Sequence, residues 1–347
     1  MSVGTAVRGR PIRIARLSVR LDIRALVACV ALAVSIVVLV FLTMTTGDYP
    51  LSVSEVVDTV LGHGPPGAEF IVLELRLPRL LTALLVGGAL GISGALMQRL
   101  TDNPLGSPDI IGFTAGSATG ALSVIVLTDG GMMAVAGGAL TGGVVTAVLI
   151  YLLAFKGGVQ GFRLVLIGIG VSAMLFAAND YLITHSSLQD AMAAVAWQVG
   201  GLNGRGWEHV EPVAWSMLVL LPFAVFFSHR LSILQMGDDA AKALGVRVES
   251  TRFVLIAVSV ALAAVGTAAA GPITFVALAA PQIARRLTRA PVAGPVAAGL
   301  TGALLLLLSD FAVQRLFSES QLPVGIATAT IGGGYLAWLL GREFRRR

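Results

Sequence analysis

Few residues of this chain have the type and spacing that bond-making chemistry requires. The single cysteine, Cys29, lies in an apolar run and has no partner for an intrachain disulfide. The histidines are scattered and share no metal-ligand spacing; they are His63, His185, His209 and His229. No G-x-x-x-x-G-K-[ST] phosphate-binding loop is present. The sequence therefore predicts no catalytic residue, no metal or cofactor, and no binding of ATP by this chain itself.

The composition indicates a protein surrounded by lipid. Of the 347 residues, 56% are apolar and only 12% are charged, and the mean hydropathy is +0.87. A water-soluble chain has roughly twice that charged fraction. The net charge of +5 does not indicate nucleic acid, because arginines cluster at the two ends, before the first apolar run and at residues 345–347. Membrane lipid is the expected environment, and nucleic acid is not an expected partner.

Uncharged runs along the chain are long enough to cross a bilayer, whose core of about 30 Å needs about 20 helical residues. The first run, 25–43, is longer than a typical signal core and is interpreted as a retained helix. The remaining runs are 80–97, 110–128, 130–155, 164–179, 212–227, 253–284, 291–309 and 322–340. The 32-residue run 253–284 contains Gly271-Pro272, which should break it into two helices. We therefore expect an all-α membrane protein with about ten transmembrane helices.

The distribution of basic residues predicts the orientation of these spans. With an even number of spans and a cytoplasmic N-terminus, the inside segments hold 20 of the 24 Lys and Arg residues. Those segments are 1–24, 98–109, 156–163, 228–252, 285–290 and 341–347. The positive-inside rule then places both termini in the cytoplasm. The expected organisation is a basic cytoplasmic arm (1–24), a transmembrane domain (25–341) that includes an inner loop (228–252), and a basic cytoplasmic tail (342–347).

The inner loop carries a pattern of small and acidic residues. It reads Gly237-Asp238-Asp239-Ala240-Ala241-Lys242-Ala243-Leu244-Gly245. The spacing of Asp239, the two alanines and Gly245 resembles the E-A-A-x-x-x-G loop of ATP-binding cassette (ABC) importer permeases. A short helix with acids near its positive end and small residues on one face can seat in a groove of a partner protein. Gly245 permits a tight helix ending.

Three further segments extend this resemblance along the chain. They are Arg76-Leu77-Pro78-Arg79 with the stretch up to Phe113, then 271–285, and finally 321–332. Together they resemble the iron-siderophore and cobalamin family of ABC importer permeases, from about residue 50 to 345 and in the right order. Segments 103–113 and 197–207 resemble ferric-enterobactin permease subunits more than cobalamin ones. The resemblance implies a type II ABC importer permease fold.

The resemblance also implies which proteins assemble with this chain and what each of them does. A second permease subunit, a homologous chain or a second copy, would enclose the path together with this one. Two ATPase subunits would sit beneath the two permease chains, and this chain would contact its ATPase through the coupling residues Gly237, Asp238, Asp239, Ala240, Ala241, Leu244 and Gly245. An extracytoplasmic siderophore-binding protein would dock on the outer face. The cargo would be a ferric siderophore, of the catecholate type by the closest motifs, and haem, cobalamin and hydroxamate siderophores remain open.

Particular residues acquire expected roles from the family. Arg76, Arg79 and Arg315 are three of the four exterior basic residues and would pair with carboxylates of the binding protein. Gly161 and Phe162 would form an inner gate, although an interfacial anchor is the alternative for Phe162. The family commonly has His where Gln282 stands, and glutamine cannot titrate near neutral pH. A structural role is therefore expected for Gln282.

Acidic residues decide against a different class of transporter. An ion-coupled secondary transporter would need paired acids near the bilayer midplane, and the centres of the predicted spans are uncharged. Asn179, Asp180 and Asp310 lie near the outer ends of spans, where we expect them to face water and not to bind substrate. An intramembrane enzyme would need catalytic acids or histidines at membrane depth, and no such constellation is visible.

Overall fold

The fold is a bundle of membrane-length helices, seen in a computed structural model that describes residues 10–14, 17–128, 130–156, 158–317 and 322–344. Part of the arm and tail predicted at 1–24 and 342–347 lies outside the described residues. Ten helices follow the predicted spans: α1 (Ile23–Thr45), α3 (Leu77–Leu100), α5 (Phe113–Thr128), α6 (Met132–Ala154), α7 (Gly161–Thr184), α9 (Trp207–Leu234), α11 (Val248–Ala270), α12 (Val276–Thr288), α13 (Pro295–Leu316) and α14 (Val324–Phe344). Among the described residues, seven segments are long and apolar enough to cross a membrane; α5, α12 and α14 complete the ten.

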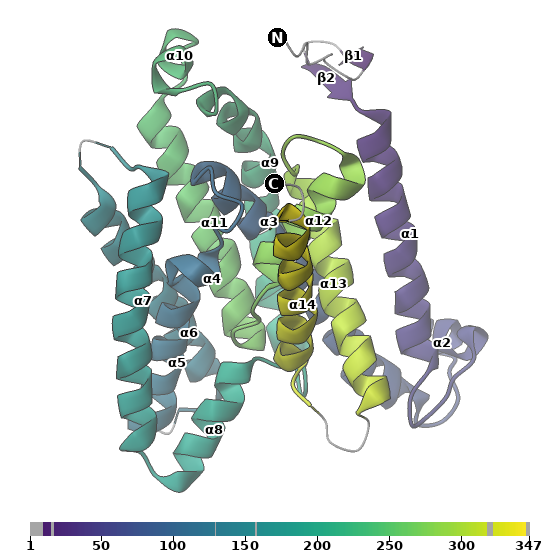
Figure 1. The fold of residues 1–347 in the computed structure, drawn as a ribbon. Helices are drawn as coiled ribbons and strands as arrows, with labels where there is room; N and C mark the ends of the chain where they lie inside the picture. The colour runs from purple at the N-terminus through teal and green to yellow at the C-terminus, as the bar shows by residue number, and fades with distance from the viewer. Residues whose placement is uncertain (1–9, 15–16, 129, 157, 318–321, 345–347) are drawn as a thin grey trace.

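The predicted break at Gly271-Pro272 is confirmed. Helix α11 ends at Ala270, and α12 begins only at Val276. Gly271 has a φ of +72° and Phe275 a φ of +68°, so the connecting segment is held in a conformation that no helix can continue. The chain reverses there, and α12 returns toward the end of the bundle from which α11 came (Figure 1).

Short elements occupy the two ends of the bundle. One end carries α10 (Asp238–Ala243), the hairpin of β1 (Arg10–Ile14) and β2 (Leu17–Leu21), and the last turn of α14 (Figure 1). The opposite end carries α2 (Val53–Val60) and α8 (Leu188–Val199), while α4 (Pro108–Ile111) lies within the bundle. A π-helix, η1 (Phe70–Arg76), leads directly into α3. We call the two ends of the bundle the α10 end and the α8 end.

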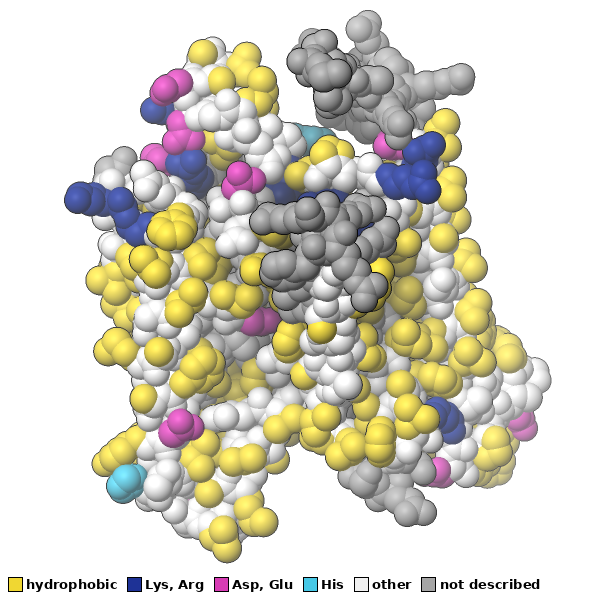
Figure 2. All heavy atoms as spheres, viewed as in Figure 1, with side chains coloured by type: hydrophobic (Ala, Val, Ile, Leu, Met, Phe, Trp, Pro, Cys, Tyr) yellow, Lys and Arg dark blue, Asp and Glu magenta, His cyan; other side chains and the backbone are white. Residues whose placement is uncertain are grey.

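The short helices α2 and α8 begin at serine caps. Ser52 caps α2 through a reciprocal capping box with Glu55, whose pKa the hydrogen bonds from Ser52 hold below its usual range. Helix α8 is capped by Ser187 and ended by Gly200. Figure 2 shows apolar side chains over the height of the bundle and most charged ones at its ends, which is the surface that a bilayer requires.

Helix α3 is the central element of the bundle. In the segment Phe70–Leu100, which contains α3, 83% of an 18-residue apolar stretch is buried inside the protein. The corresponding stretch of α1 is only 11% buried. Glycines allow the neighbours of α3 to approach its backbone directly. A Cβ on Gly87 would lie 2.5 Å from the carbonyl oxygen of Gly302 on α13, and a Cβ on Gly94 only 1.7 Å from that of Ala277 on α12. The small residues of α3 therefore form the close helix contacts that are typical of membrane proteins.

Adding one methyl group at this contact should destabilise the bundle. In Gly94→Ala the new carbon meets backbone, which cannot rotate away, so we expect a loss of about 1–3 kcal/mol, typical of overpacking. The matched control is Gly137→Ala on α6, where a Cβ meets nothing within 4 Å and alanine favours the helix. Melting temperatures of the purified variants in detergent measure the difference. Equal melting temperatures for both would contradict this account of the α3 contact.

Candidate functional site

Helix α10 is a short projection at one end of the bundle, joined to α9 and α11. Asp238 at its first turn accepts two hydrogen bonds from Arg252 of α11, at 2.7 Å and 3.0 Å. This forked ion pair fixes the direction of α10 relative to the membrane helices. Lys242 lies 3.8 Å from Asp239 on the surface of the helix, an exposed pair that contributes little to stability. The predicted coupling residues thus form one rigid structural unit.

The far end of α10 is closed by a Schellman motif. Gly245 has a φ of +79°, its amide donates to the Lys242 carbonyl at 2.9 Å, and the Val246 amide donates to the Ala241 carbonyl at 2.9 Å. Ala241 is fully buried and Val246 packs against the same apolar cluster. Leu244 is 63% exposed. One side of α10 is therefore anchored in the bundle, and the other presents an apolar side chain to solution.

At the opposite end of the bundle, Arg79 is engaged within the chain. Its Nη2 donates to Asp310 Oδ1 at 2.7 Å and its Nε to Oδ2 at 3.0 Å, which joins α3 to α13. Asp310 is 1% exposed and accepts a further hydrogen bond from Gln314 at 2.6 Å. Water-facing was the expectation for Asp310, and it was wrong: the carboxylate is buried because a guanidinium from another helix neutralises it. Asn179 is also buried, at 2% exposure, whereas Asp180 is exposed.

The three predicted docking arginines line one cleft of about 570 Å³ at the α8 end. Arg76 donates to the carbonyls of Met44, at 2.5 Å, and Tyr49, at 2.6 Å, so it ties the end of α1 to η1. Arg315 is exposed and lies over the Phe311 ring, 5.6 Å from its centroid. Only Arg315 therefore has its guanidinium both exposed and free of a hydrogen bond to another residue in the described part of this cleft.

The predicted gate residues begin α7 at the α10 end. A Cβ on Gly161 would lie 2.5 Å from the Cα of Thr101, so Gly161 allows α7 to pack on the turn after α3. Phe162 is 80% exposed and points away from the bundle. An exposed ring can contact a second permease chain or lipid. A gate function for Phe162 stays a prediction.

Gln282 belongs to a buried network of hydrogen bonds. It is 4% exposed, and its Nε2 donates to Gln98 Oε1 at 2.7 Å and to the Pro104 carbonyl at 3.1 Å. Gln98 in turn donates to the Leu278 carbonyl at 3.0 Å. The amide of Gln282 thus joins α12 to α3 and to the turn after it. Both amide groups act as fixed, neutral donors and acceptors, which supports the expected structural role.

A carboxyl group near the middle of the bundle escaped the sequence analysis. Asp109 of α4 accepts a hydrogen bond from Thr114 at 2.7 Å and lies beside the backbone amide of Phe275. Phe275 lies at the start of α12, whose length of about 20 Å separates it from the α10 end. It also packs against Gly332, which lies about 12 Å along α14 from the start of that helix at the α8 end. Phe275 and Asp109 are therefore well inside the bundle. Asp109 belongs to the segment 98–109, which was assigned to an inner loop, but α4 folds into the bundle. Its carboxyl group therefore lies at membrane depth, although the predicted spans themselves have uncharged centres.

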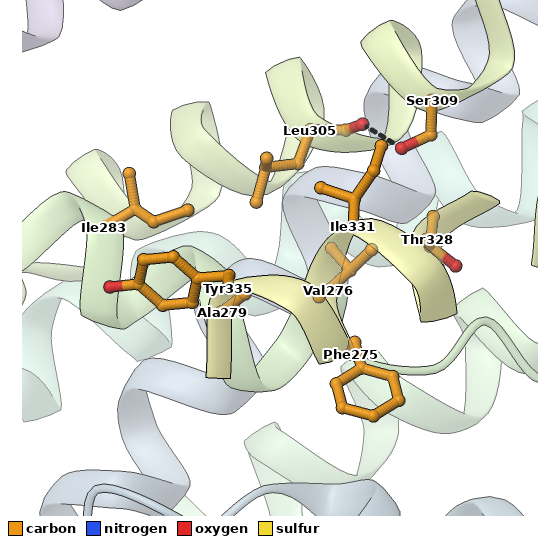
Figure 3. Close-up of a pocket in the computed structure, with 10 residues that line it drawn as sticks. Phe275, Val276, Ala279, Ile283, Leu305, Ser309, Thr328, Ile331 and Tyr335 are labelled. Atoms are coloured by element: carbon orange, nitrogen blue, oxygen red, sulfur yellow. Dashed lines mark hydrogen bonds between the residues drawn. The ribbon is translucent and has the colours of Figure 1, made fainter. Parts of the chain in front are cut away.

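A pocket between α12, α13 and α14 is too small to carry a metal chelate. Phe275, Ile283, Ile331 and Tyr335 line it with apolar surface, and Ser309 beside it donates to its own helix at Leu305, at 2.8 Å (Figure 3). Its volume of about 20 Å³ is close to that of a single water site, whereas ligand pockets measure about 300–1,000 Å³. This pocket is a packing defect between helices and not a cargo site.

Ten helices, an interrupted α11–α12 pair and a short projecting helix define the class of the protein. A solved metal-chelate type ABC transporter, in an inward-facing conformation, superposes with a TM-score of 0.82 at 30% identity and covers 90% of this chain and 98% of its own. The fold is that of a type II ABC importer permease. The chain is a multi-pass protein of the inner membrane, and as a permease subunit it is not an enzyme; ATP hydrolysis belongs to a separate subunit.

The chain belongs to the FecCD transport family, which matches residues 35–342. The ferric enterobactin transport system permease protein FepG of Escherichia coli is 45% identical over 93% of this chain and 98% of its own length. The achromobactin transport system permease protein CbrC of Dickeya dadantii is 37% identical over 90% and 91%. The vitamin B12 import system permease protein BtuC of E. coli is 34% identical over 79% and 85%. These relatives confirm the predicted family.

The ion pair between Arg79 and Asp310 should stabilise the fold independently of any partner. Arg79→Met leaves a buried carboxylate with only Gln314, so we expect a loss of about 3 kcal/mol, the lower end for breaking a buried pair because Arg79 keeps some contact with water. Arg315→Met is the matched control and should cost little. Melting temperatures of the two purified variants measure the contrast.

A double variant separates the ion pair from side-chain size. Arg79→Met combined with Asp310→Asn removes both charges, and part of the lost stability should return because no unpaired carboxylate remains. If Arg79→Met and Arg315→Met melted alike, or if the double variant recovered nothing, Arg79 would not act through Asp310.

Proposed function

We propose that this chain is the permease subunit that carries a ferric siderophore, of the catecholate type, through the cytoplasmic membrane. The similarity of nearly the whole chain to a ferric enterobactin permease carries this proposal. Other relatives are named for citrate and hydroxamate chelates of iron, which share a large, metal-bearing cargo. Haem, cobalamin and hydroxamate siderophores are the alternative cargoes that an uptake experiment distinguishes.

The path would lie between this chain and a second permease chain. The interior of the described bundle is filled by close helix contacts, and the pocket of about 20 Å³ between α12, α13 and α14 cannot admit a chelate. A path between two chains needs no such interior space. The partner is a homologous permease or a second copy. In this arrangement the exposed ring of Phe162 would face the partner and close the inner end of the path.

The α10 end would face the cytoplasm. In that orientation the basic residues counted above lie inside, and both termini are cytoplasmic. Two ATPase subunits would then lie beneath the two permease chains, and one of them would dock on α10, whose exposed Leu244 and rigidly held acidic first turn suit a groove on a partner. The extracytoplasmic siderophore-binding protein would dock at the α8 end, over the cleft that holds Arg76, Arg79 and Arg315.

Uptake into vesicles tests the proposal. Proteoliposomes that contain this chain with its permease and ATPase partners should take up ferric enterobactin when the binding protein and ATP are supplied. Uptake should continue after ion gradients are collapsed, because ATP hydrolysis drives it. Uptake that requires an ion gradient instead would overturn the proposal. Transport of haem, cobalamin or a hydroxamate siderophore in place of ferric enterobactin would change the identity of the cargo but leave the proposed ATP-driven import in place.

Leu244→Asp should separate ATPase docking from folding. The side chain is exposed, so a charge there should leave the melting temperature unchanged but place an unpaired carboxylate in the proposed interface. We expect at least a tenfold loss of ATPase co-purification and of uptake. Leu61→Asp, 66% exposed next to α2, is the control and should retain the ATPase. Retention of the ATPase by both variants would exclude docking through Leu244.

Arg315 offers a cleaner test of binding-protein docking than Arg79, whose ion pair supports the fold. Arg315→Glu should weaken association with the binding protein about tenfold or more at low salt, because a repulsive pair replaces an attractive one. Arg24→Glu makes the same charge change at the α10 end and should have no effect. Surface plasmon resonance on the detergent-solubilised complex measures both affinities. Equal affinities for the two variants would remove Arg315 from the interface.

A further inference from the structure

A buried arginine at the α10 end lacks a carboxylate partner. Arg99, in the last turn of α3, is 8% exposed. Its Nη2 donates to the Ser228 carbonyl at 3.1 Å and to Ser232 Oγ at 2.8 Å, both on α9. Its Nε is buried and has no hydrogen-bond partner in the described part of the chain. Burying an unpaired charge is unfavourable, so a compensating anion would stabilise this arrangement.

Arg99 lines an open cavity of about 150 Å³ with mixed polar and apolar walls, formed by α3, the turn 101–104, the end of α9 at Gln235, α12 and the segment 291–293. A second guanidinium, that of Arg285 in the last turn of α12, lines the same cavity. Arg285 is exposed, and its side chain makes no ion pair within the described residues. Asp102 is also exposed and lines the cavity, so the charged residues around it are two arginines and one aspartate.

The wall of the cavity is held in place before any ligand arrives. Asn103 accepts a hydrogen bond from the Leu105 amide at 2.9 Å through Oδ1, which leaves its NH₂ group as a donor for other partners. Gln282 fixes the same turn through the Pro104 carbonyl at 3.1 Å. The turn is therefore tied to α12, and the two arginines stand on helices that are packed together. Such preorganised donors reduce the ordering that binding requires.

We propose that this cavity binds an oxyanion of the phosphate type, held by Arg99 and Arg285. Guanidinium groups bind phosphate oxygens in a forked geometry, and the amide of Asn103 supplies a further donor. A volume of about 150 Å³ suits a phosphate group but is below the range of about 300 Å³ and more that accommodates larger ligands. The same chemistry is present in inorganic phosphate and in the headgroup of an anionic phospholipid, since the cavity lies at one end of the membrane helices.

Binding of inorganic phosphate to the full chain in detergent tests the first source. Calorimetric titration at constant ionic strength should detect binding, and Arg285→Gln should weaken it about tenfold or more, as expected for losing a hydrogen bond to a charged group. Arg285 is exposed, so this variant should fold. Arg99→Met should abolish binding, and its folding is checked by its melting temperature. Arg24→Gln, which removes one positive charge elsewhere at the α10 end, is the matched control and should bind as the unaltered chain does.

Nanodiscs distinguish the second source. With phosphatidylglycerol in place of phosphatidylcholine, native mass spectrometry should show a retained anionic lipid on the unaltered chain and on Arg24→Gln, and its loss from Arg285→Gln. If the chain retains the anionic lipid but does not bind inorganic phosphate, the ligand of the cavity is a lipid headgroup. If it binds inorganic phosphate but retains no lipid, the ligand is free phosphate. If neither ligand binds, or if Arg24→Gln and Arg285→Gln lose binding equally, the proposed anion site is wrong.

Discussion

The close approach of α3 to its neighbours is the constraint on which the rest of the structure depends. Glycines at 87, 91 and 94 bring the α3 backbone against the backbones of α12 and α13, where any side chain would collide. Dispersion forces and packing, and not a hydrophobic driving force, hold such contacts in lipid. Helix α3 has 24 residues and so extends about 36 Å. It carries Arg79 at one end and Arg99 at the other, so one packed rod connects the cleft at the α8 end with the cavity at the α10 end.

Polar groups within the bundle are accommodated by partners on other helices. Ser93 and Ser259 exchange hydrogen bonds with each other's carbonyls, at 2.7 Å and 2.9 Å. Gln98 pairs with Gln282, and Arg79 with Asp310. Each pair joins α3 to a different helix. Each also supplies the hydrogen bonds that water would make in solution and that lipid cannot make. The polar contacts thus select one arrangement of helices that are otherwise uniformly apolar, because a slipped helix would leave both partners unsatisfied.

The sequence predicts the local features of this structure and misses those that depend on distant partners. Hydropathy and Gly271-Pro272 give the ten helices because length and backbone geometry are local properties. The capping residue Ser52 and the helix end at Gly245 are likewise read from nearby residues. Asp310 was assigned to water because nothing near it in sequence indicates a partner; Arg79 lies 231 residues away. Asp109 was assigned to a loop because hydropathy cannot show that α4 folds back into the bundle.

The same packing limits how the proposed transport cycle can work. Where two helices contact each other through their backbones, there is no layer of side chains between them that could rearrange as the helices slide or rotate. Close-packed interiors in general switch between discrete arrangements and do not deform continuously. Opening a path inside the bundle would require separating α3 from α12 and α13 and breaking the buried pairs along it. Moving this bundle as one body against a second permease chain breaks none of them. Because Asp238 and Arg252 fix α10 to α11, force applied to α10 is transmitted to the bundle as a whole. In the proposed complex, with an ATPase on α10, this packing favours alternating access by rigid-body motion of the bundle, with the changes confined to surfaces that face a partner.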